Sequence, residues 1–411
     1  MATLSAEIPE NGPEKPPRNR RHIPLALRIF LGLLVIAALG SGGSVLRGYR
    51  QLTAIREIEK LGGSVGRFPI GPLWLRKVIG ENQMRMFDQV IDASFVGTQV
   101  NDATLEHLRE FRALKSLWLH EAGVADASLE HLQGLTSLES LWLDGTKVTD
   151  AGLKSLGGLP SLKWLSLNGT QVTDAGLEHL RGLSALKWLS LDGAKVTDAG
   201  LQHLLGLTRL EVLSLAGTQV TDVGLEHLRG LSALKTLWLD DTHVTDAGLE
   251  YLGELTALEY LCLNHTRVNG TGLQHLRGLT ALETLLLDET PMTDAGLERL
   301  RGHGALKELA LDHTQVTDTG LEQLRGLTSL KELRLNHARV TDAGLRHLRE
   351  LTALERLSLK DTPVTDAGLE HLHGLTALKQ LWLDGTQVTK AGVAELQRAL
   401  PKVQIGDVSI L

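Results

Sequence analysis

Leucines recur along most of this chain with a fixed spacing. The motif LxxLxL returns every 24 residues without insertion or deletion, in twelve full copies that begin at Leu114, Leu138, Leu162, Leu186, Leu210, Leu234, Leu258, Leu282, Leu306, Leu330, Leu354 and Leu378. A degenerate copy, VIDASF, precedes them in register from Val90. A period of this size indicates a solenoid, in which each unit buries its apolar face only against its neighbours.

The hydrophobic period changes within each unit, as residues 162–184 illustrate. The leucines of LxL alternate as in a short strand. The segment VTDAG then predicts a helix start, because Thr173 or Asp174 is a favourable N-cap and an acid in the first turn suits the helix dipole. Leucines spaced three apart over 177–183 predict a short helix, and Gly182 favours a left-handed exit from it.

The pattern LxxLxLxxTxVTDxGLxxLxxL resembles the leucine-rich repeat family over about residues 90–400. Its VTDAGL segment looks most like the bacterial relatives of the cysteine-containing subtype found in F-box proteins. The resemblance implies an α/β solenoid, a curved horseshoe with a parallel sheet on the concave face and short helices on the convex face. Where the family usually has Asn or Cys, this chain has Thr (Thr146, Thr170) or Ala (Ala122, Ala194, Ala338). The hydroxyl of Thr can bond the turn backbone, so the three Ala turns are expected to be looser or to hold water.

Alternation along each strand predicts which side chains leave the core. The residues between the inward leucines form two outward columns, and all six tryptophans of the repeat region fall in them. We expect Trp118 to stack on Trp142 and Trp164 on Trp188. The candidate partner-binding residues, including acids of the next column, are Trp118, Trp142, Trp164, Trp188, Trp238, Tyr260, Asp144, Asp192 and Asp240.

Two interpretations of these columns stand side by side. The tryptophans either cover the sheet as copies of one duplicated module or form a recognition surface, since exposed apolar patches and Trp in particular mark binding sites. The acidic and amide column either caps the turn after each strand or favours a basic partner.

One column further, glycines give way to charged residues. Gly145, Gly169, Gly193 and Gly217 are followed by Asp241, His265, Glu289, His313, His337 and Asp361. This series is either a solvated rim, a metal site or a group that titrates near pH 6. Eight further histidines are expected to be solvated on the convex face, at His107, His131, His179, His203, His227, His275, His347 and His371.

Charge and composition narrow the function. Residues 1–89 hold 13 Lys and Arg against 7 Asp and Glu, a net charge of +6, whereas the remainder holds 29 against 42, a net charge of −13. An acidic body argues against nucleic acid as a partner. Cys262 is the only cysteine of the 411 residues, so no intrachain disulfide forms. The sequence contains no catalytic or phosphate-binding motif, and we expect neither an enzyme nor a cofactor or metal.

The region before the repeats has its own organisation. Residues 1–22 read as a disordered Pro-rich basic tail. Residues 23–46 predict a single-pass transmembrane anchor, because 18 uncharged residues run from Ile29 to Leu46; a cleaved signal peptide and a buried helix are the alternatives. Residues 47–89 are expected to form an amphipathic helix and a cap in which Trp74 is packed, and residues 401–411 a C-terminal cap. The positive-inside rule leans towards an extracytoplasmic repeat domain.

These observations predict a membrane-anchored, non-enzymatic bacterial protein that binds a protein or peptide ligand through its concave face. A substrate-recognition adaptor, as the F-box resemblance suggests, and a passive structural scaffold are the alternatives. No F-box-like segment is visible in the sequence.

Overall fold

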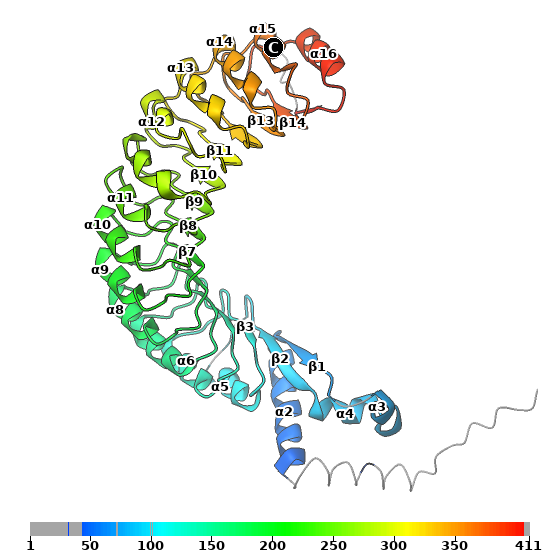
Figure 1. Cartoon of the computed structure of the whole chain (residues 1–411). Helices are drawn as coiled ribbons and strands as arrows, with labels where there is room; N and C mark the ends of the chain where they lie inside the picture. Colours follow the sequence, from blue (N-terminus) through cyan, green and yellow to red (C-terminus); the bar gives the residue numbers. More distant parts are fainter. Residues whose placement is uncertain (1–31, 33–42, 71–72, 99, 101, 407–411) are drawn as a thin grey trace, which may run out of the picture. The chain divides into compact units, whose positions relative to one another are not determined.

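The computed structural model describes residue 32 and residues 43–70, 73–98, 100 and 102–406 (Figure 1). The chain divides into two compact units, Met1–Arg50 with Pro69–Asp88, and Gln51–Phe68 with Gln89–Leu411. No helix in the described ranges combines the length and the apolar character needed to cross a membrane. The tail expected over 1–22, and the span expected over 23–46 apart from Gly32 and residues 43–46, lie outside those ranges.

The first unit packs around a buried arginine. Its elements are the start of α2 (Gly43–Lys60), α3 (Leu73–Ile79), α4 (Glu81–Met84) and η1 (Arg85–Phe87). The guanidinium of Arg76 is buried against Asp88, lies 2.8 Å from Glu81 and donates to the carbonyl of Ile70 at 3.2 Å. The expectation that Trp74 packs is wrong. Arg76 takes a buried place on α3, and the Trp74 side chain is 58% exposed.

The second unit is one continuous sheet of 15 strands in chain order, as far as the described residues go. Neighbouring strands of the repeats pair in parallel at an offset of 24 residues, as Trp164 does with Trp188. The strands are β1 (Ser64–Phe68), β2 (Gln89–Ser94), β3 (Ser116–Trp118), β4 (Ser140–Trp142), β5 (Trp164–Ser166), β6 (Trp188–Ser190), β7 (Val212–Ser214), β8 (Thr236–Trp238), β9 (Tyr260–Cys262), β10 (Thr284–Leu286), β11 (Glu308–Ala310), β12 (Glu332–Arg334), β13 (Arg356–Ser358), β14 (Gln380–Trp382) and β15 (Gln404–Ile405).

The two ends of this sheet differ. At the start, β1 pairs antiparallel with β2, which is the degenerate copy VIDASF, and covers its free edge. Ala54, Ile55 and Ile58 from the C-terminal half of α2 are buried in the same core. At the other end, β15 continues the parallel order beside β14 after the longer helix α16 (Lys390–Ala399).

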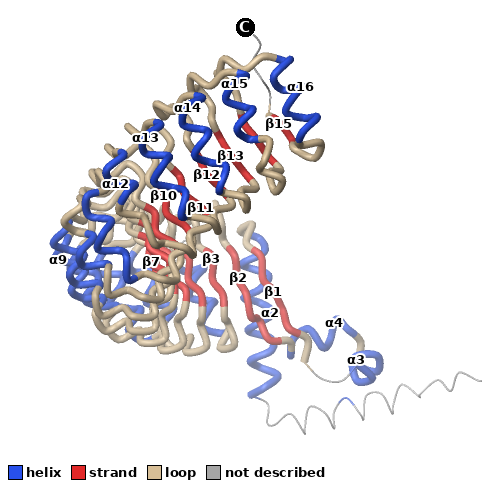
Figure 2. Tube along the Cα trace, turned by 45° about the horizontal axis from the view of Figure 1, so that its top comes forward, coloured by secondary structure: helices blue, strands red, loops and turns tan. Residues whose placement is uncertain are grey.

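Short helices cover the outer side of the second unit, while the strands line its inner side (Figures 1 and 2). One α-helical turn usually continues into a 3₁₀ turn, whose period of three matches the spacing of the leucines. The α-helical segments are α5 (Asp102–Glu106), α6 (Asp126–Leu129), α7 (Asp150–Leu153), α8 (Asp174–Leu177), α9 (Asp198–Leu201), α10 (Asp222–Leu225), α11 (Leu249–Leu252), α12 (Asp294–Glu298), α13 (Asp318–Leu321), α14 (Asp342–Leu345) and α15 (Asp366–Leu369). The 3₁₀ segments are η2 (His107–Glu110), η3 (Glu130–Leu132), η4 (Lys154–Gly158), η5 (Glu178–Leu180), η6 (Gln202–Leu204), η7 (Glu226–Leu228), η8 (Thr271–Gly278), η9 (Glu322–Gly326), η10 (Arg346–Glu350) and η11 (Glu370–Leu372).

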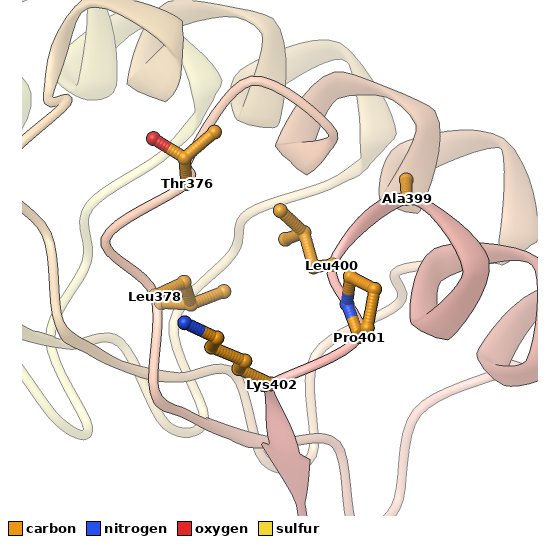
Figure 3. Close-up of a pocket in the computed structure, with 6 residues that line it drawn as sticks. All are labelled: Thr376, Leu378, Ala399, Leu400, Pro401 and Lys402. Carbon is orange, nitrogen blue, oxygen red and sulfur yellow. The ribbon is translucent and has the colours of Figure 1, made fainter.

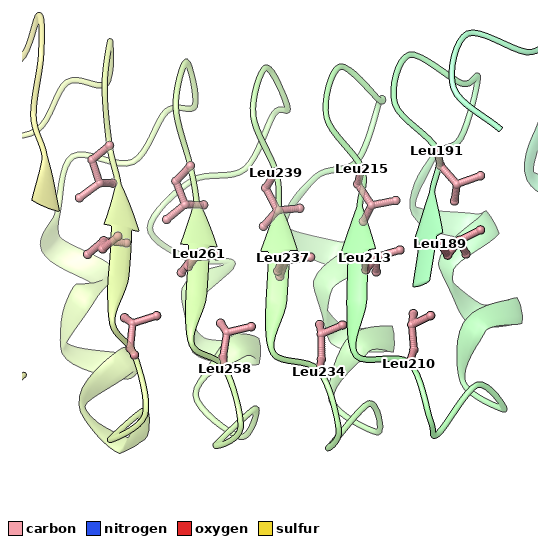
Figure 4. Close-up of a cluster of buried hydrophobic side chains, with 14 of the residues drawn as sticks. Leu189, Leu191, Leu210, Leu213, Leu215, Leu234, Leu237, Leu239, Leu258 and Leu261 are labelled. Atoms are coloured by element: carbon pink, nitrogen blue, oxygen red, sulfur yellow. The ribbon is translucent and has the colours of Figure 1, made fainter. Parts of the chain in front are cut away.

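Leucine rows between the strands and the helices form the core. The leucines of successive LxxLxL motifs lie side by side in rows that run from repeat to repeat, as Figure 4 shows for Leu189, Leu213, Leu237 and Leu261. All four are fully buried. Each full repeat therefore gives its apolar surface to the two repeats beside it, as the 24-residue period predicts.

A carboxylate ladder joins the helix starts of successive repeats. The hydroxyl of Thr173 accepts the Ala175 N–H as the N-cap of α8. The Asp174 carboxylate, one residue on, accepts the backbone N–H of Thr197 at 2.7 Å and its hydroxyl at 2.6 Å. The same Asp-to-Thr pair of bonds recurs from the acids Asp126, Asp150, Asp198, Asp222, Asp294, Asp318, Asp342 and Asp366. We call this series the Asp–Thr ladder.

One repeat interrupts the Asp–Thr ladder. Its sequence is VNGTGL, so Asn269 and Gly270 stand where most other repeats have Thr and Asp. Asp246 of the preceding repeat accepts three backbone N–H groups instead, from Asn269, Gly270 and Gly272. This repeat forms the 3₁₀ segment η8 over residues 271–278.

A backbone hydrogen bond can close the turn after a strand, whether Thr or Ala stands at the closing position. The Thr170 hydroxyl donates to the carbonyl of Leu167 at 2.7 Å, which confirms the bond expected for threonine. The Ala194 turn keeps the backbone bond from its N–H to Leu191 at 2.9 Å, against 3.3 Å in the Thr170 turn. The expectation of looser Ala turns is therefore wrong, because the backbone bond alone holds the turn.

Two other local expectations are corrected. Gly182 does not exit the helix in the left-handed region; the left-handed glycine of that repeat is Gly169, in the turn after the strand. The convex histidines are mostly half-buried between repeats, and His347 is only 5% exposed, with Arg325 Nη2 at 2.6 Å from its Nδ1. Burial and the two neighbouring cations Arg325 and Arg346 lower the pKa of His347.

Two glycine substitutions separate the Asp–Thr ladder from general helix effects. A Cβ added at Gly176 would lie 2.4 Å from Oδ1 of Asp150 and 3.2 Å from its Cα, so Gly176→Ala must displace the preceding rung. We expect a loss of about 1–3 kcal/mol in the free energy of unfolding, measured by urea denaturation. The matched control is Gly182→Ala, where nothing lies within 4 Å, and it should be neutral or slightly stabilising. Equal midpoints for both variants would contradict the close packing of Gly176 on Asp150.

Candidate functional site

The outward columns of strands β3 to β14 form the inner surface of the second unit. The central leucine of each strand is buried, and the residues on either side of it lie on the opposite face. Small residues in the second column are themselves covered, because Ser166, Ser190 and Ser214 are almost fully buried beneath the larger side chains around them. The inner surface therefore has a floor of serines from which the tryptophans project.

The rings of this surface pair differently from the expectation. Trp142 packs on Trp188, two strands away, with ring centroids 5.0 Å apart at 46°. The interposed strand β5 carries Ser166 in the same column as Trp142, and its small side chain lets the two rings meet across it. Neither of the two expected in-register stacks, of Trp118 on Trp142 and of Trp164 on Trp188, forms among the described residues; the contact is the diagonal one of Trp142 with Trp188.

The remaining predicted aromatic residues fall into distinct settings. Trp164 is 37% exposed, and the ammonium of Lys163 lies 5.7 Å from its ring centroid. Trp238 and Tyr260 form a second ring pair at 5.5 Å and pack against a small apolar cluster of Cys262, Leu286 and Ala310. The structure thus brings together two aromatic pairs, Trp142 with Trp188 and Trp238 with Tyr260, while Trp118 is half-buried at the start of the series.

The predicted acids do structural work at the end of each strand. Oδ1 of Asp144 accepts the Asn168 N–H at 3.2 Å, and Oδ1 of Asn168 accepts the Asp192 N–H at 2.8 Å. Asp192 continues the series to the Ala216 N–H at 3.1 Å. We call this second series the Asx ladder; it shows that turn capping is one role of the column.

Ala216 breaks the Asx ladder, and the break was visible in the sequence as the one small residue between Asp144 and Asp384 in that column. Asp240 on the far side of the break accepts the thiol of Cys262. Burial raises the pKa of the Asp240 carboxyl and also raises the pKa of the Cys262 thiol, so this thiol is a poor nucleophile.

A hollow of about 240 Å³ lies at the break in the Asx ladder. It is lined by Asn168, Trp188, Ser190, Asp192, Ser214, Ala216, Trp238 and Asp240. Four residues of the predicted site, Trp188, Trp238, Asp192 and Asp240, therefore meet around one cavity, which the sequence analysis did not foresee.

A second hollow, of about 250 Å³, lies at the C-terminal end of the stack (Figure 3). Its lining is mainly apolar, and Lys402 is the one charged residue in it; the lining residues are Thr376, Leu378, Ala399, Leu400, Pro401 and Lys402. With a single charged group, it offers less chemistry than the hollow on the sheet.

The residues of the column that changes from glycine to charged residues all have a left-handed backbone conformation. Gly169 has a φ of 62°, and Asp241, His265, Glu289, His313, His337 and Asp361 hold φ values of 52–57° in the same turn. Left-handed backbone costs a non-glycine residue about 1 kcal/mol or more. Imidazole and carboxylate lie 3.3 Å apart in the His265–Glu289 pair. No group of three ligating side chains suited to a metal exists among the described residues.

A double-mutant cycle tests the diagonal ring contact. For Trp142→Ala and Trp188→Ala, singly and together, we expect a coupling of about 0.5–1.5 kcal/mol in the free energy of unfolding, since the rings touch. The matched cycle of Trp118→Ala with Trp142→Ala, neighbours in register on β3 and β4, should give a coupling near zero. Urea denaturation followed by circular dichroism measures both. A larger coupling in the second cycle would restore the in-register stack.

Known proteins share the repeat and the fold of this chain. A sequence profile described as "Leucine Rich repeat" matches residues 326–349. No curated protein matches the chain. An internalin from Listeria monocytogenes is similar in fold, with a TM-score of 0.64 and 24% identity over 78% of this chain and 87% of that one. A leucine-rich-repeat protein of Leptospira interrogans has a TM-score of 0.56 and 20% identity over 74% of this chain and 80% of that one. The repeat match and the structural similarity agree: residues 326–349 match the leucine-rich-repeat profile, and the second unit has the leucine-rich-repeat fold.

Proposed function

We propose that this protein recognises another protein or a peptide through its inner sheet surface and performs no catalysis, with no cofactor of its own. Its repeats, in this proposal, are the bacterial 24-residue type related to the cysteine-containing subfamily of F-box proteins. The partner is basic where it meets the acids of the surface, because Asp144, Asp192 and Asp240 present carboxylates beside the rings.

The observation that carries the proposal is the aromatic surface itself. Trp142 and Trp188 lie on the face opposite the buried leucines and contact each other across the strand that carries the buried Ser166, so they are not needed to cover the leucine core. The strands hold them by short parallel pairing, and the ring contacts hold them against one another. Rigid, partly exposed tryptophans lose little conformational entropy on binding, which is why they dominate binding surfaces.

The alternatives explain less of this surface. A passive scaffold needs the leucine core and the two ladders but has no use for half-exposed rings at Trp142, Trp164 and Trp188. An adaptor of the F-box type would also bind through its repeats, and it differs by a second segment that docks on degradation machinery. Neither the residues nor the fold supply a feature that favours such a segment over simple recognition.

The location of the protein is a further part of the proposal. We propose that residues 23–46 anchor the chain as a single pass, because of their uncharged length, and that the repeats lie outside the cytoplasm. Protease added to intact cells should then digest the repeats, and a known exported protein serves as the control for access. Protection until the cells are lysed, with the control digested, would place the repeats in the cytoplasm.

Removal of three rings tests recognition. Peptides are first selected from a displayed library of random dodecapeptides on the full chain in detergent micelles. For the variant with Trp142, Trp164 and Trp188 all changed to Ala, we expect at least a tenfold loss of affinity for the selected peptides, with the fold intact by circular dichroism because none of the three is in the leucine core.

The control variant is Val223→Ala, which removes an exposed side chain from α10 on the outer side and should leave affinity unchanged. Peptides that bind the triple variant as tightly as the parent protein would show that recognition does not use the aromatic surface.

A further inference from the structure

The hollow at the break in the Asx ladder is produced by one strand with small side chains. Ser214 at the end of strand β7 and Ala216 in the turn after it line the hollow together with Trp188 and Asp192 of the preceding repeat and Trp238 and Asp240 of the next. Ala216 stands where every neighbouring repeat has Asp or Asn, so a polar side chain is missing at the centre of the hollow. The gap therefore arises from two residue choices in one repeat rather than from the fold.

Two tryptophans line the hollow from different strands. Trp188 on β6 and Trp238 on β8 belong to strands two steps apart, which at the usual strand spacing is about 10 Å. Trp188 is supported by Trp142 at 5.0 Å, and Trp238 by Tyr260 at 5.5 Å. Each of these two tryptophans is therefore held in place by a ring outside the hollow, and its other side faces the hollow. The two rings form a preorganised slot for a flat group.

Two carboxylates flank the same gap without a cation. In the acidic column, Asp144 meets His120 at 2.6 Å, Asp288 and Asp312 share Arg334, and Asp384 meets Lys360 at 2.9 Å. Among the described residues, Asp192 and Asp240 are the acids of this column that form no ion pair, and both line the hollow.

The polar neighbours of these two acids do not supply the missing charge. The Asp192 carboxylate accepts the hydroxyl of Ser214, the Ser190 hydroxyl at 3.1 Å and the backbone N–H of Ala216, and Asp240 accepts the thiol of Cys262. All of these donors are neutral. Burial without a cation raises the pKa of the Asp240 carboxyl. A cation placed between the two acids would offset that burial.

We propose that the hollow takes the guanidinium of an arginine side chain from the partner. The planar group would lie between Trp188 and Trp238 and donate from its opposite edges to Asp192 and Asp240. Arginine fits better than lysine because it stacks on rings and has donors on several sides, whereas an ammonium is a compact, strongly hydrated point. This inference rests on the proposed function, and it names the residue by which the partner is selected.

The first test uses a fragment of the ligand and needs no partner. The full chain in micelles is labelled with 5-fluorotryptophan, and its seven signals are assigned by Trp→Phe variants. On titration with N-acetyl-L-argininamide, we expect the Trp188 and Trp238 signals to shift saturably, with a Kd on the order of 1 mM for so small a ligand. The neutral analogue N-acetyl-L-citrullinamide should give no saturable shift.

Asparagine variants test the carboxylates without disturbing the turn. Asn168 and Asn264 occupy the same column and accept a backbone N–H as Asp192 does, and an amide oxygen at position 240 can still accept the Cys262 thiol, so Asp192→Asn and Asp240→Asn should keep the fold. Together they should weaken argininamide binding at least tenfold. The matched control is Asp384→Asn, whose acid already pairs with Lys360 and which should bind argininamide as the parent does.

The outcomes separate this inference from the proposed function. Argininamide shifts that are absent, equal with citrullinamide, matched by N-acetyl-L-lysinamide, or unchanged in the double Asn variant would each overturn the arginine slot. In selected peptides that depend on the three tryptophans, replacement of arginine by citrulline should cost at least tenfold in affinity. If that replacement costs nothing, recognition by the surface stands and the slot is wrong. If no peptide is selected yet argininamide binds as expected, the slot stands and peptide recognition fails.

Discussion

On the helix side, each repeat is joined to the next chiefly by bonds from an aspartate to the threonine 23 residues later. Asp174 satisfies both the backbone N–H and the hydroxyl of Thr197, and that same hydroxyl accepts an N–H at the start of the next helix. A single carboxylate thus caps its own helix dipole, joins two repeats and positions the next cap. The strict 24-residue period follows, because one inserted residue would displace every later rung.

The outward positions of the inner surface can therefore accept many residue types. The leucine rows and the Asp–Thr ladder hold the second unit together from the core and the helix side, and the Asx ladder closes the turns. The outward strand positions supply none of the side chains that form the leucine rows or accept the backbone bonds of the two ladders. Their residues can therefore change from repeat to repeat at little cost in stability. That freedom explains why tryptophan gathers over β3 to β8 while glutamate and arginine gather over β11 to β13.

Ion pairing on the inner surface also differs between the aromatic strands and the charged strands. Over β11 to β13, Arg334 joins Asp288 and Asp312, and Arg356 pairs with Glu332, so these charges are already satisfied within the chain. Over β6 to β8 the rings dominate, and Asp192 and Asp240 remain without a cation among the described residues. A partner would gain by bringing a positive group to the aromatic part, because Asp192 and Asp240 lie there beside the rings and form no ion pair among the described residues.

The sequence alone determined the solenoid, its register, the leucine core and the outward position of every tryptophan in the repeats, because periods of 24 and 2 are properties of the chain. The tertiary structure decided what neighbours do across strands. Trp142 reaches Trp188 because Ser166 between them is small, Gly176 must be glycine because Asp150 lies against it, and His347 is buried by the repeat before it. The hollow beside Ala216 belongs to the same class: its residues come from four repeats, and only packing shows that they surround one space.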